Sequence, residues 1–141
     1  MITAADIAKW KVLIVEDDAD ARFLMTYLLE FKGAVVHVAE HGEEALALLE
    51  EFFPDLIILD IAMPVMDGWE TLKRIREINI FDQVPVIAVT AHAMKGDRER
   101  ILEAGFDYYI SKPFSPATVL DELVQALNQQ THVVAYLGAK R

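Results

Sequence analysis

Five short apolar segments recur along the chain and constrain its fold more than any other feature. Each segment is continuous rather than alternating, and each is rich in β-branched or aromatic residues. Strands have this composition when helices cover both faces of their sheet, as in parallel sheets. The sequence therefore predicts five parallel strands, at residues 12–15, 34–38, 56–59, 86–89 and 108–110.

Segments with helical spacing separate these strands. In the first of them, Phe23, Tyr27 and Phe31 recur at every fourth position and predict one apolar face of a helix. The repeated order of strand and helix predicts an α/β fold in which right-handed crossovers place helices on both faces of the sheet. The predicted helices cover residues 19–32, 43–52, 68–78, 95–104 and 116–128.

Four residues mark predicted helix ends. Asp18 and Asp67 each precede a helix, and we expect their carboxylates to accept backbone N–H groups as N-caps. For Asp18 we favour this role over metal ligation. Gly33 and Gly105 each follow a helix, where the chain needs a positive φ.

The charge and composition exclude several classes of protein. The 13 Lys and Arg against 23 Asp and Glu give a net charge of −10, which argues against binding to nucleic acids or anionic membranes. The absence of cysteine excludes a disulfide scaffold, a thiolate metal site and cysteine catalysis. With 141 residues, 54% of them apolar, the chain suits one domain. No leader or spanning segment is visible, so we expect a soluble cytoplasmic protein.

Polar side chains follow the ends of four predicted strands. Glu16 and Asp17 follow the first strand, Asp60 the third, Thr90 the fourth and Lys112 the fifth. In open parallel sheets these ends share one rim, and ligands bind there. Clustered carboxylates need a cation among them, and hard oxygen ligands suit Mg²⁺. A lysine and a hydroxyl suit a phosphoryl group, and an aspartate can form an acyl phosphate with it.

Four motifs at these positions resemble the signature of response-regulator receiver domains. The motifs are Val12–Asp18, Asp60–Gly68, Val89–Ala91 and Ser111–Pro113. The resemblance covers about residues 10–130. It implies a flavodoxin-like, doubly wound sheet of five parallel strands in the order 2-1-3-4-5, with five helices in a three-layer sandwich.

The resemblance implies a role for each residue at the acidic rim. Asp60 matches the phosphoacceptor, and Lys112 matches the lysine that pairs with the phosphoryl group. Glu16 and Asp17 match the acidic pair, of which Asp17 is the expected direct Mg²⁺ ligand and Glu16 acts through water. At Ala62 the family uses the backbone carbonyl as a metal ligand.

The same resemblance implies a conformational switch. Thr90 matches the hydroxyl that turns toward the phosphoryl group, and Tyr109 matches the aromatic residue that moves inward with it. Tyr108 and Tyr109 alternate on their strand, so we expect one to be buried and the other to lie near the surface. Lys112–Pro113 matches a cis peptide, and Gly68 matches the small residue after the phosphorylation loop.

Two further positions concern the lifetime of the phosphoryl group. Ala62 lies two residues after Asp60, and His92 lies two residues after Thr90. In receivers these positions flank the path of the hydrolytic water. Ala62 offers no polar group to orient that water, whereas His92 could orient or obstruct it. Our hypothesis is that these two side chains set the phosphoryl lifetime.

The expected function is that of a stand-alone receiver. It would not be an enzyme, because it would catalyse only its own phosphorylation and autodephosphorylation. It would accept a phosphoryl group from a sensor histidine kinase or a histidine phosphotransfer protein, with Mg²⁺ as cofactor. It would act on a downstream protein target or pass the phosphoryl group onward in a relay, and its output surface would lie near the fourth helix, the fifth strand and the fifth helix.

Three alternatives accompany this prediction. The chain could be a phosphorylation-independent pseudo-receiver, although its complete set of acidic, hydroxyl and lysine residues argues against that. It could be the receiver of a hybrid histidine kinase. A flavodoxin-like cofactor binder or a small phosphatase is disfavoured, because no glycine-rich phosphate loop follows the first strand and no second aspartate stands two residues after Asp60.

The predicted domain covers residues 11–130, between an N-terminal extension at 1–10 and a C-terminal tail at 131–141. The extension holds Ile2, Ile7 and Trp10, which could cover an edge of the sheet. The tail contains an apolar stretch that would be unusual in water. It could pack on its own domain, or it could pair with a second copy and form a homodimer.

Overall fold

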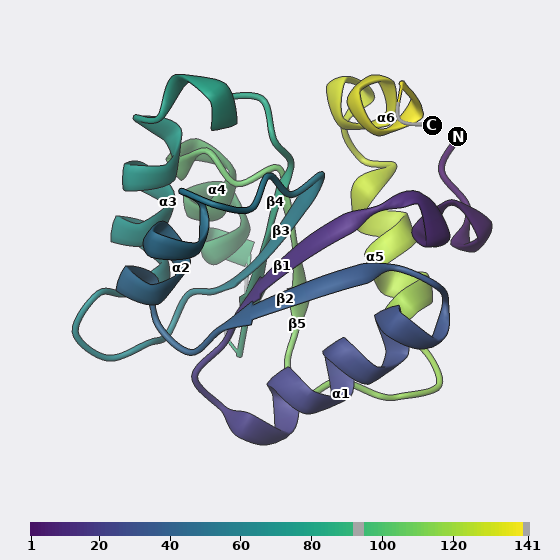
Figure 1. The fold of residues 1–141 in the computed structure, drawn as a ribbon, viewed down its shortest axis with the longest axis horizontal. Coiled ribbons are helices and arrows are strands. Elements are labelled where there is room, and N and C mark those ends of the chain that lie inside the picture. Colours follow the sequence, from purple (N-terminus) through teal and green to yellow (C-terminus); the bar gives the residue numbers. More distant parts are fainter. Residues whose placement is uncertain (92–94, 140–141) are drawn as a thin grey trace.

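The computed structural model describes residues 1–91 and 95–139, without the side chain of Lys95, and contains the predicted parallel sheet. The strand order is β2-β1-β3-β4-β5, which confirms the predicted topology (Figure 1). All four neighbouring pairs are parallel. The strands are β1 (Lys11–Val15), β2 (Val35–Ala39), β3 (Leu56–Asp60), β4 (Val86–Thr90) and β5 (Tyr108–Ser111).

Helices cover both faces of the sheet, as predicted. Helices α1 and α5 pack on one face around Leu29 and Leu123, and α2, α3 and α4 pack on the other around Leu72 and Ile101. The α-helices are α1 (Ala19–Phe31), α2 (Gly42–Leu48), α3 (Gly68–Arg76), α4 (Lys95–Ala104), α5 (Val119–Leu127) and α6 (Thr131–Gly138). Two 3₁₀ helices, η1 (Ala4–Lys9) and η2 (Asn79–Phe81), complete the elements of the described residues.

Helix α2 ends earlier than its sequence pattern suggests. The helix stops at Leu48, whereas the pattern predicts a helix up to Phe52. Phe52 lies off the helix, and its ring stacks on His37 of β2 with the centroids 3.9 Å apart. The chain continues in a hydrogen-bonded turn, in which the N–H of Phe52 donates to the carbonyl of Leu48 at 2.8 Å, and local periodicity does not contain the contact with His37.

The aromatic face of α1 points to solvent, which corrects the simplest interpretation of its spacing. Phe23, Tyr27 and Phe31 are 73%, 57% and 75% exposed, and their rings stack along the helix at centroid distances of 6.5 and 6.3 Å. Met25 and Leu29, on the opposite side of the helix, are buried against the sheet. A helix on a sheet buries only one of its sides, and in α1 the buried side is the aliphatic one.

The four residues predicted at helix ends are confirmed, whereas α5 begins at Val119 and not at the predicted residue 116. Asp18 Oδ2 accepts a hydrogen bond from the backbone N–H of Ala21 at 2.9 Å, and Asp67 Oδ1 accepts one from Glu70 at 2.9 Å. Gly33 and Gly105 have φ of +100° and +109°, the left-handed region that glycine enters at the least cost.

The first helix, η1, and the last described helix, α6, pack at the amino-terminal end of the sheet, opposite the acidic rim (Figure 1). Ile2 and Trp10 are buried, and Ile2 exchanges two backbone hydrogen bonds with the side chain of Asn128, each 2.9 Å long. In the tail, α6 buries Val133 and Leu137 in the core on the α1 and α5 side. The described part of the tail thus packs on its own domain, and a tail-mediated homodimer stays a prediction.

Asp107, the buried carboxylate just before β5, connects α6 to the sheet. Asp107 accepts hydrogen bonds from Arg76 at 3.1 Å and from the backbone N–H of Val86 at 2.8 Å, and it lies 2.6 Å from Nε2 of His132 in α6. Arg76 also donates to four backbone carbonyls around these strands. None of these contacts is visible in the local sequence pattern.

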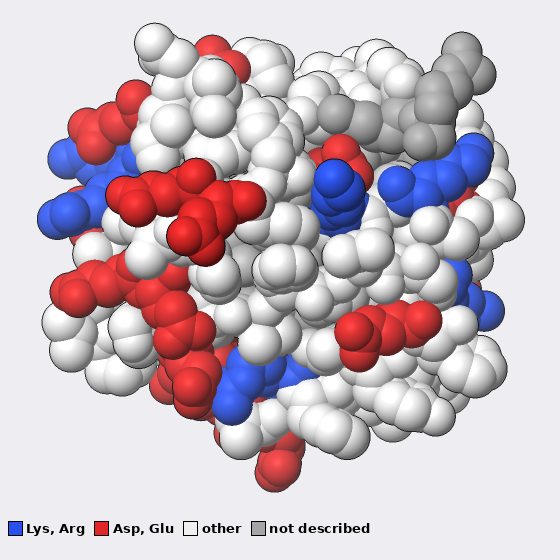
Figure 2. Space-filling model, viewed as in Figure 1, with Lys and Arg blue, Asp and Glu red and all other residues white. Residues whose placement is uncertain are grey.

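Charge is unevenly distributed over the surface. In Figure 2 acidic side chains gather on the side of α2 and near the start of α1, while the surface over β2 and the body of α1 is largely uncharged. Among the described residues, no helix is both long enough and apolar enough to cross a membrane.

Candidate functional site

The centre of the acidic rim is a cluster of three carboxylates. Glu16 and Asp17 follow β1, and Asp60 ends β3, its neighbour in the sheet. One carboxylate oxygen from each lies within 4.8 Å of the other two. Glu16 and Asp60 are buried, whereas Asp17 is exposed. The strand order therefore brings together residues more than 40 positions apart in the sequence.

Lys112 supplies the positive charge of this cluster. Its Nζ lies 2.8 Å from Oε1 of Glu16 and 3.4 Å from Oδ2 of Asp60. The backbone N–H of Lys112 donates to the carbonyl of Thr90 at 2.8 Å, which ties the loop after β5 to the end of β4. The Lys112–Pro113 peptide bond is cis, the isomer that the resemblance implies.

The electrostatics of the cluster leave it short of positive charge. Burial, and after it the Glu16 carboxylate, raise the pKa of Asp60 to about 8, and Lys112 offsets only part of their effect. Burial lowers the pKa of Lys112, but the hydrogen bonds and charges of Glu16 and Asp60 outweigh it and hold that pKa above its usual value. A second cation at the cluster would favour the ionised form of Asp60.

Hydrogen bonds fix the loop between β1 and α1. The backbone N–H of Asp18 donates to Oε2 of Glu16 at 3.2 Å. The guanidinium of Arg22 donates to the carbonyl of Glu16 at 2.8 Å and lies 3.5 Å from the carboxylate of Glu40. Sequence reasoning missed Arg22, because a basic residue on a predicted helix carries no signal that it turns back to a strand end.

The loop between β3 and α3 is closely packed around Asp60. The backbone N–H of Ala62 donates to Oδ1 of Asp60 at 3.2 Å, and the N–H of Gly68 donates to the carbonyl of Ile61 at 2.8 Å. A Cβ at position 68 would overlap backbone atoms of Asp60 and Ile61. Gly68 therefore sets how closely α3 approaches the strand end. The role of the Ala62 carbonyl as a metal ligand stays a prediction.

The predicted switch residues lie on the next two strands. Thr90 is buried at the end of β4, beside β3, and Tyr109 lies on β5 opposite Ala88. The expected contrast between the two tyrosines is wrong, because Tyr108 and Tyr109 are both half-buried. Strand β5 is at the edge of the sheet, so neither face hides a ring completely. His92 lies outside the described residues.

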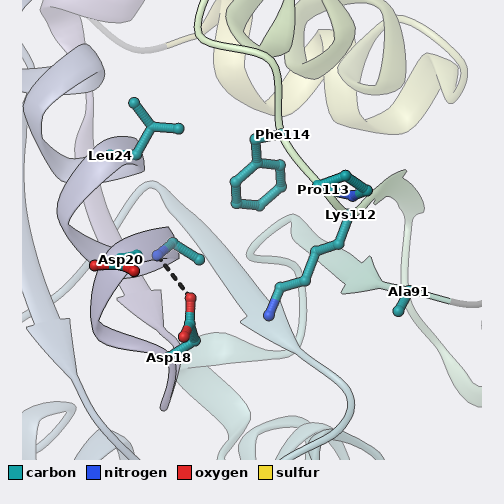
Figure 3. A pocket seen from close by; sticks show the side chains of 8 residues that line it. Asp18, Asp20, Leu24, Ala91, Lys112, Pro113 and Phe114 are labelled. Carbon is teal, nitrogen blue, oxygen red and sulfur yellow. Dashed lines mark hydrogen bonds between the residues drawn. The ribbon is translucent and has the colours of Figure 1, made fainter.

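A cavity of about 440 Å³ opens beside the ammonium group of Lys112 (Figure 3). Figure 3 shows Lys112 extending between the start of α1 and the loop after β5, with Asp18 on one side and Phe114 near Pro113. The lining residues are Asp18, Asp20, Ala21, Leu24, Ala91, Lys112, Pro113 and Phe114. The cavity reaches Lys112 of the cluster, and Leu24 and Phe114 give it apolar walls that sequence reasoning missed.

Comparisons with known proteins identify the family. The family model of the response regulator receiver domain matches residues 12–128. The polar-differentiation response regulator DivK of Brucella anthropi is 45% identical over 104 residues, which cover 74% of this chain and 85% of DivK. The chain belongs to the response regulator receiver family, whose members are signalling proteins of two-component systems and not classical enzymes.

Solved structures match the fold. Chemotaxis response regulator CheY4 of Vibrio cholerae has a TM-score of 0.78 at 32% identity, with 83% of this chain and 98% of CheY4 covered. The receiver domain of sensor histidine kinase PA1611 from Pseudomonas aeruginosa PAO1 has a TM-score of 0.73 at 30% identity, with 92% and 98% covered. That PA1611 structure has a magnesium ion coordinated in its active site cleft.

Proposed function

We propose that this receiver accepts a phosphoryl group on Asp60 from a phosphohistidine of a sensor kinase or a histidine phosphotransfer protein. The observation that carries the proposal is the cluster of Glu16, Asp17 and Asp60, with Lys112 within 3.4 Å of Asp60 beside an open cavity. Asp60 is the nucleophile: its Oδ1 accepts the backbone N–H of Ala62, and its Oδ2 lies 3.4 Å from the ammonium of Lys112, which can stabilise an incoming phosphoryl group.

The transfer exchanges one bond to phosphorus for another. A carboxylate oxygen of Asp60 forms a bond to phosphorus as the phosphorus–nitrogen bond of the donor breaks, and the electron pair of that bond returns to the imidazole. No proton moves from Asp60, because the attacking form is the carboxylate. Lys112 lies close enough to stabilise the negative charge on the transferred group.

The donor set suits Mg²⁺, which prefers hard oxygen ligands. Asp17 and Asp60 would bind the ion directly with the carbonyl of Ala62, and Glu16 would act through water. The bound ion would neutralise charge at the cluster and keep Asp60 ionised, against the burial that raises its pKa.

The signal would leave the site through Thr90 and Tyr109. Thr90 would turn toward the phosphoryl group, and Tyr109 would move inward into the space that Thr90 leaves. The surface formed by α4, β5 and α5 would then change its contacts with a downstream protein, or the phosphoryl group would pass onward in a relay. The same chemistry would operate if this sequence functions as the receiver of a larger hybrid kinase.

Intact-protein mass spectrometry tests the proposal. Incubation with a small acyl-phosphate donor and Mg²⁺ should add one phosphoryl unit, about 80 Da, to the wild-type chain. The gain should disappear in Asp60→Asn and when the metal is chelated. Asp82→Asn, which removes an exposed carboxylate outside the cluster, is the matched control and should gain the same mass as the wild type.

Absence of the gain in a folded wild-type protein that binds Mg²⁺ would contradict the proposal and favour a pseudo-receiver. A gain that persists in Asp60→Asn would place the phosphoryl group on another residue and would also contradict it.

The lifetime hypothesis adds a separate prediction. If Ala62 and His92 control access of the hydrolytic water, then Ala62→Asn and His92→Glu should each change the rate at which the phosphorylated protein loses its mass increment. A polar group that orients water contributes about 100-fold, the low end of general acid–base effects. Dephosphorylation rates equal to wild type in both variants would reject the hypothesis.

A further inference from the structure

The rings of Tyr108 and Tyr109 stack on each other, although the two residues are consecutive on a strand. Their centroids are 4.9 Å apart and their planes differ by 22°. Consecutive strand residues normally point to opposite faces of a sheet. Consistent with this, Tyr108 packs against the core beneath α1 and α5, and Tyr109 packs against the core beneath α2, α3 and α4.

The position of β5 explains how the two rings can meet. Strand β5 is the last strand of the sheet, so one of its edges has no neighbouring strand. Rings from opposite faces can lie against each other only around that edge. A Tyr109 ring that contacts Tyr108 in this way is held toward the edge of the sheet, and it cannot also occupy the inward position beside Thr90.

Tyr108 also contacts α4. The guanidinium carbon of Arg98 lies 5.6 Å from the centroid of the Tyr108 ring, and that of Arg100 lies 5.1 Å from the centroid of Trp69. Among the described side chains of α4, Ile101 is the buried one. The cation–π contacts of its two arginines therefore add to the apolar anchor of Ile101 in holding α4, and one of them rests on Tyr108.

We propose that Tyr108 is a positioning residue of the switch: its ring holds Tyr109 at the sheet edge in the unphosphorylated protein and connects Tyr109 to Arg98 of α4. The inference rests on the proposed switch role of Tyr109. Inward movement of Tyr109 separates the two rings, which leaves Tyr108 free to shift and changes the surface on which Arg98 rests. Tyr108 thus sets both the resting population of the switch and its connection to α4.

Removal of the Tyr108 ring gives an expected effect with a definite sign. Aromatic pairing of this kind favours the stacked arrangement by about two- to tenfold. In Tyr108→Ala the ratio of inward to edge positions of Tyr109 should therefore rise by about two- to tenfold. Tyr108→Phe keeps the ring and should keep the wild-type ratio.

The measurement is the solvent accessibility of the Tyr109 ring in the unphosphorylated protein. A fluorotyrosine at position 109 is observed by ¹⁹F NMR while a soluble paramagnetic agent is added. If Tyr108 merely covers Tyr109, removal of the Tyr108 ring makes the Tyr109 ring more accessible. If Tyr108 holds Tyr109 outward, its loss makes the ring less accessible, because Tyr109 then moves inward.

Phe53→Ala is the matched control. Phe53 is a partly exposed ring that lies 5.0 Å from the ring of Phe81, before the start of β3 and therefore remote from the switch. Its truncation should leave the accessibility of Tyr109 unchanged. Lower accessibility in Tyr108→Ala, with wild-type values in Tyr108→Phe and Phe53→Ala, would support the inference.

Unchanged or higher accessibility in Tyr108→Ala would overturn the inference, and so would equal values in Tyr108→Ala and Tyr108→Phe. The NMR comparison needs no phosphorylation, whereas the proposed function is tested by the mass gain at Asp60. If the wild-type chain gains no phosphoryl group, the proposed function is refuted. That result is distinct from a failure of the tyrosine contact, which the NMR comparison measures separately.

Discussion

Gly68→Ala should lower the free energy of unfolding by about 2–4 kcal/mol, the upper range for overpacked sites. The added Cβ would overlap the carbonyl carbon and oxygen of Asp60 and the Cα of Ile61. These are backbone atoms at the end of a buried central strand, so they cannot rotate away as a side chain would. Relief requires α3 to move away from β3, and that movement disturbs Asp60 directly.

Denaturant-induced unfolding measures this effect. Gly96→Ala is the matched control, because a Cβ at Gly96 meets no atom within 4 Å and the residue lies in α4. That variant should gain up to about 1 kcal/mol of stability from the higher helix propensity of alanine. Equal shifts in the two variants would contradict the argument that close packing at Asp60 requires glycine at position 68.

Asp60→Asn should make the metal-free protein more stable near pH 7.5 by about 2 kcal/mol. This is a fraction of the free energy that corresponds to a pKa shift of several units. The folded state raises the pKa of Asp60 from 3.8 to about 8, chiefly through burial and then through Glu16. Between these pH values the folded protein holds a proton that the unfolded chain has released, so the contribution of Asp60 to stability falls as the pH rises. Asparagine has no such proton to lose.

The stability difference between wild type and Asp60→Asn should therefore shrink toward pH 4 and reach its maximum near pH 8. Unfolding curves recorded from pH 4.5 to 8.5 with a chelator test this expectation, and Asp82→Asn controls for the loss of one negative charge. Added Mg²⁺ should raise the stability of the wild type more than that of Asp60→Asn. A stability difference independent of pH would contradict the argument from burial.

The sequence determined the sheet and the identity of the rim residues. The five apolar segments indicated strands, and their alternation with helices indicated parallel pairing. Burial on both faces holds for the central strands β3 and β4, whereas the edge strand β2 is largely exposed. Because parallel strands end at one rim, the side chains after β1, β3, β4 and β5 could be assigned to one site before their contacts were known. The capping aspartates and the positive-φ glycines were equally predictable, since their roles depend on the nearest turn of chain.

Tertiary structure alone decided the features that depend on competition between distant groups. Both faces of α1 offered apolar residues, and only packing on the sheet selected Met25 and Leu29 and left Phe23, Tyr27 and Phe31 in solvent. The contact of His132 with Asp107 likewise joins residues 25 positions apart. The raised pKa of Asp60 and the stacking of Tyr108 on Tyr109 arise from burial and from the free edge of β5. Periodicity and spacing describe a chain's neighbours along the sequence, whereas burial, pairing and exposure depend on which surfaces meet in space.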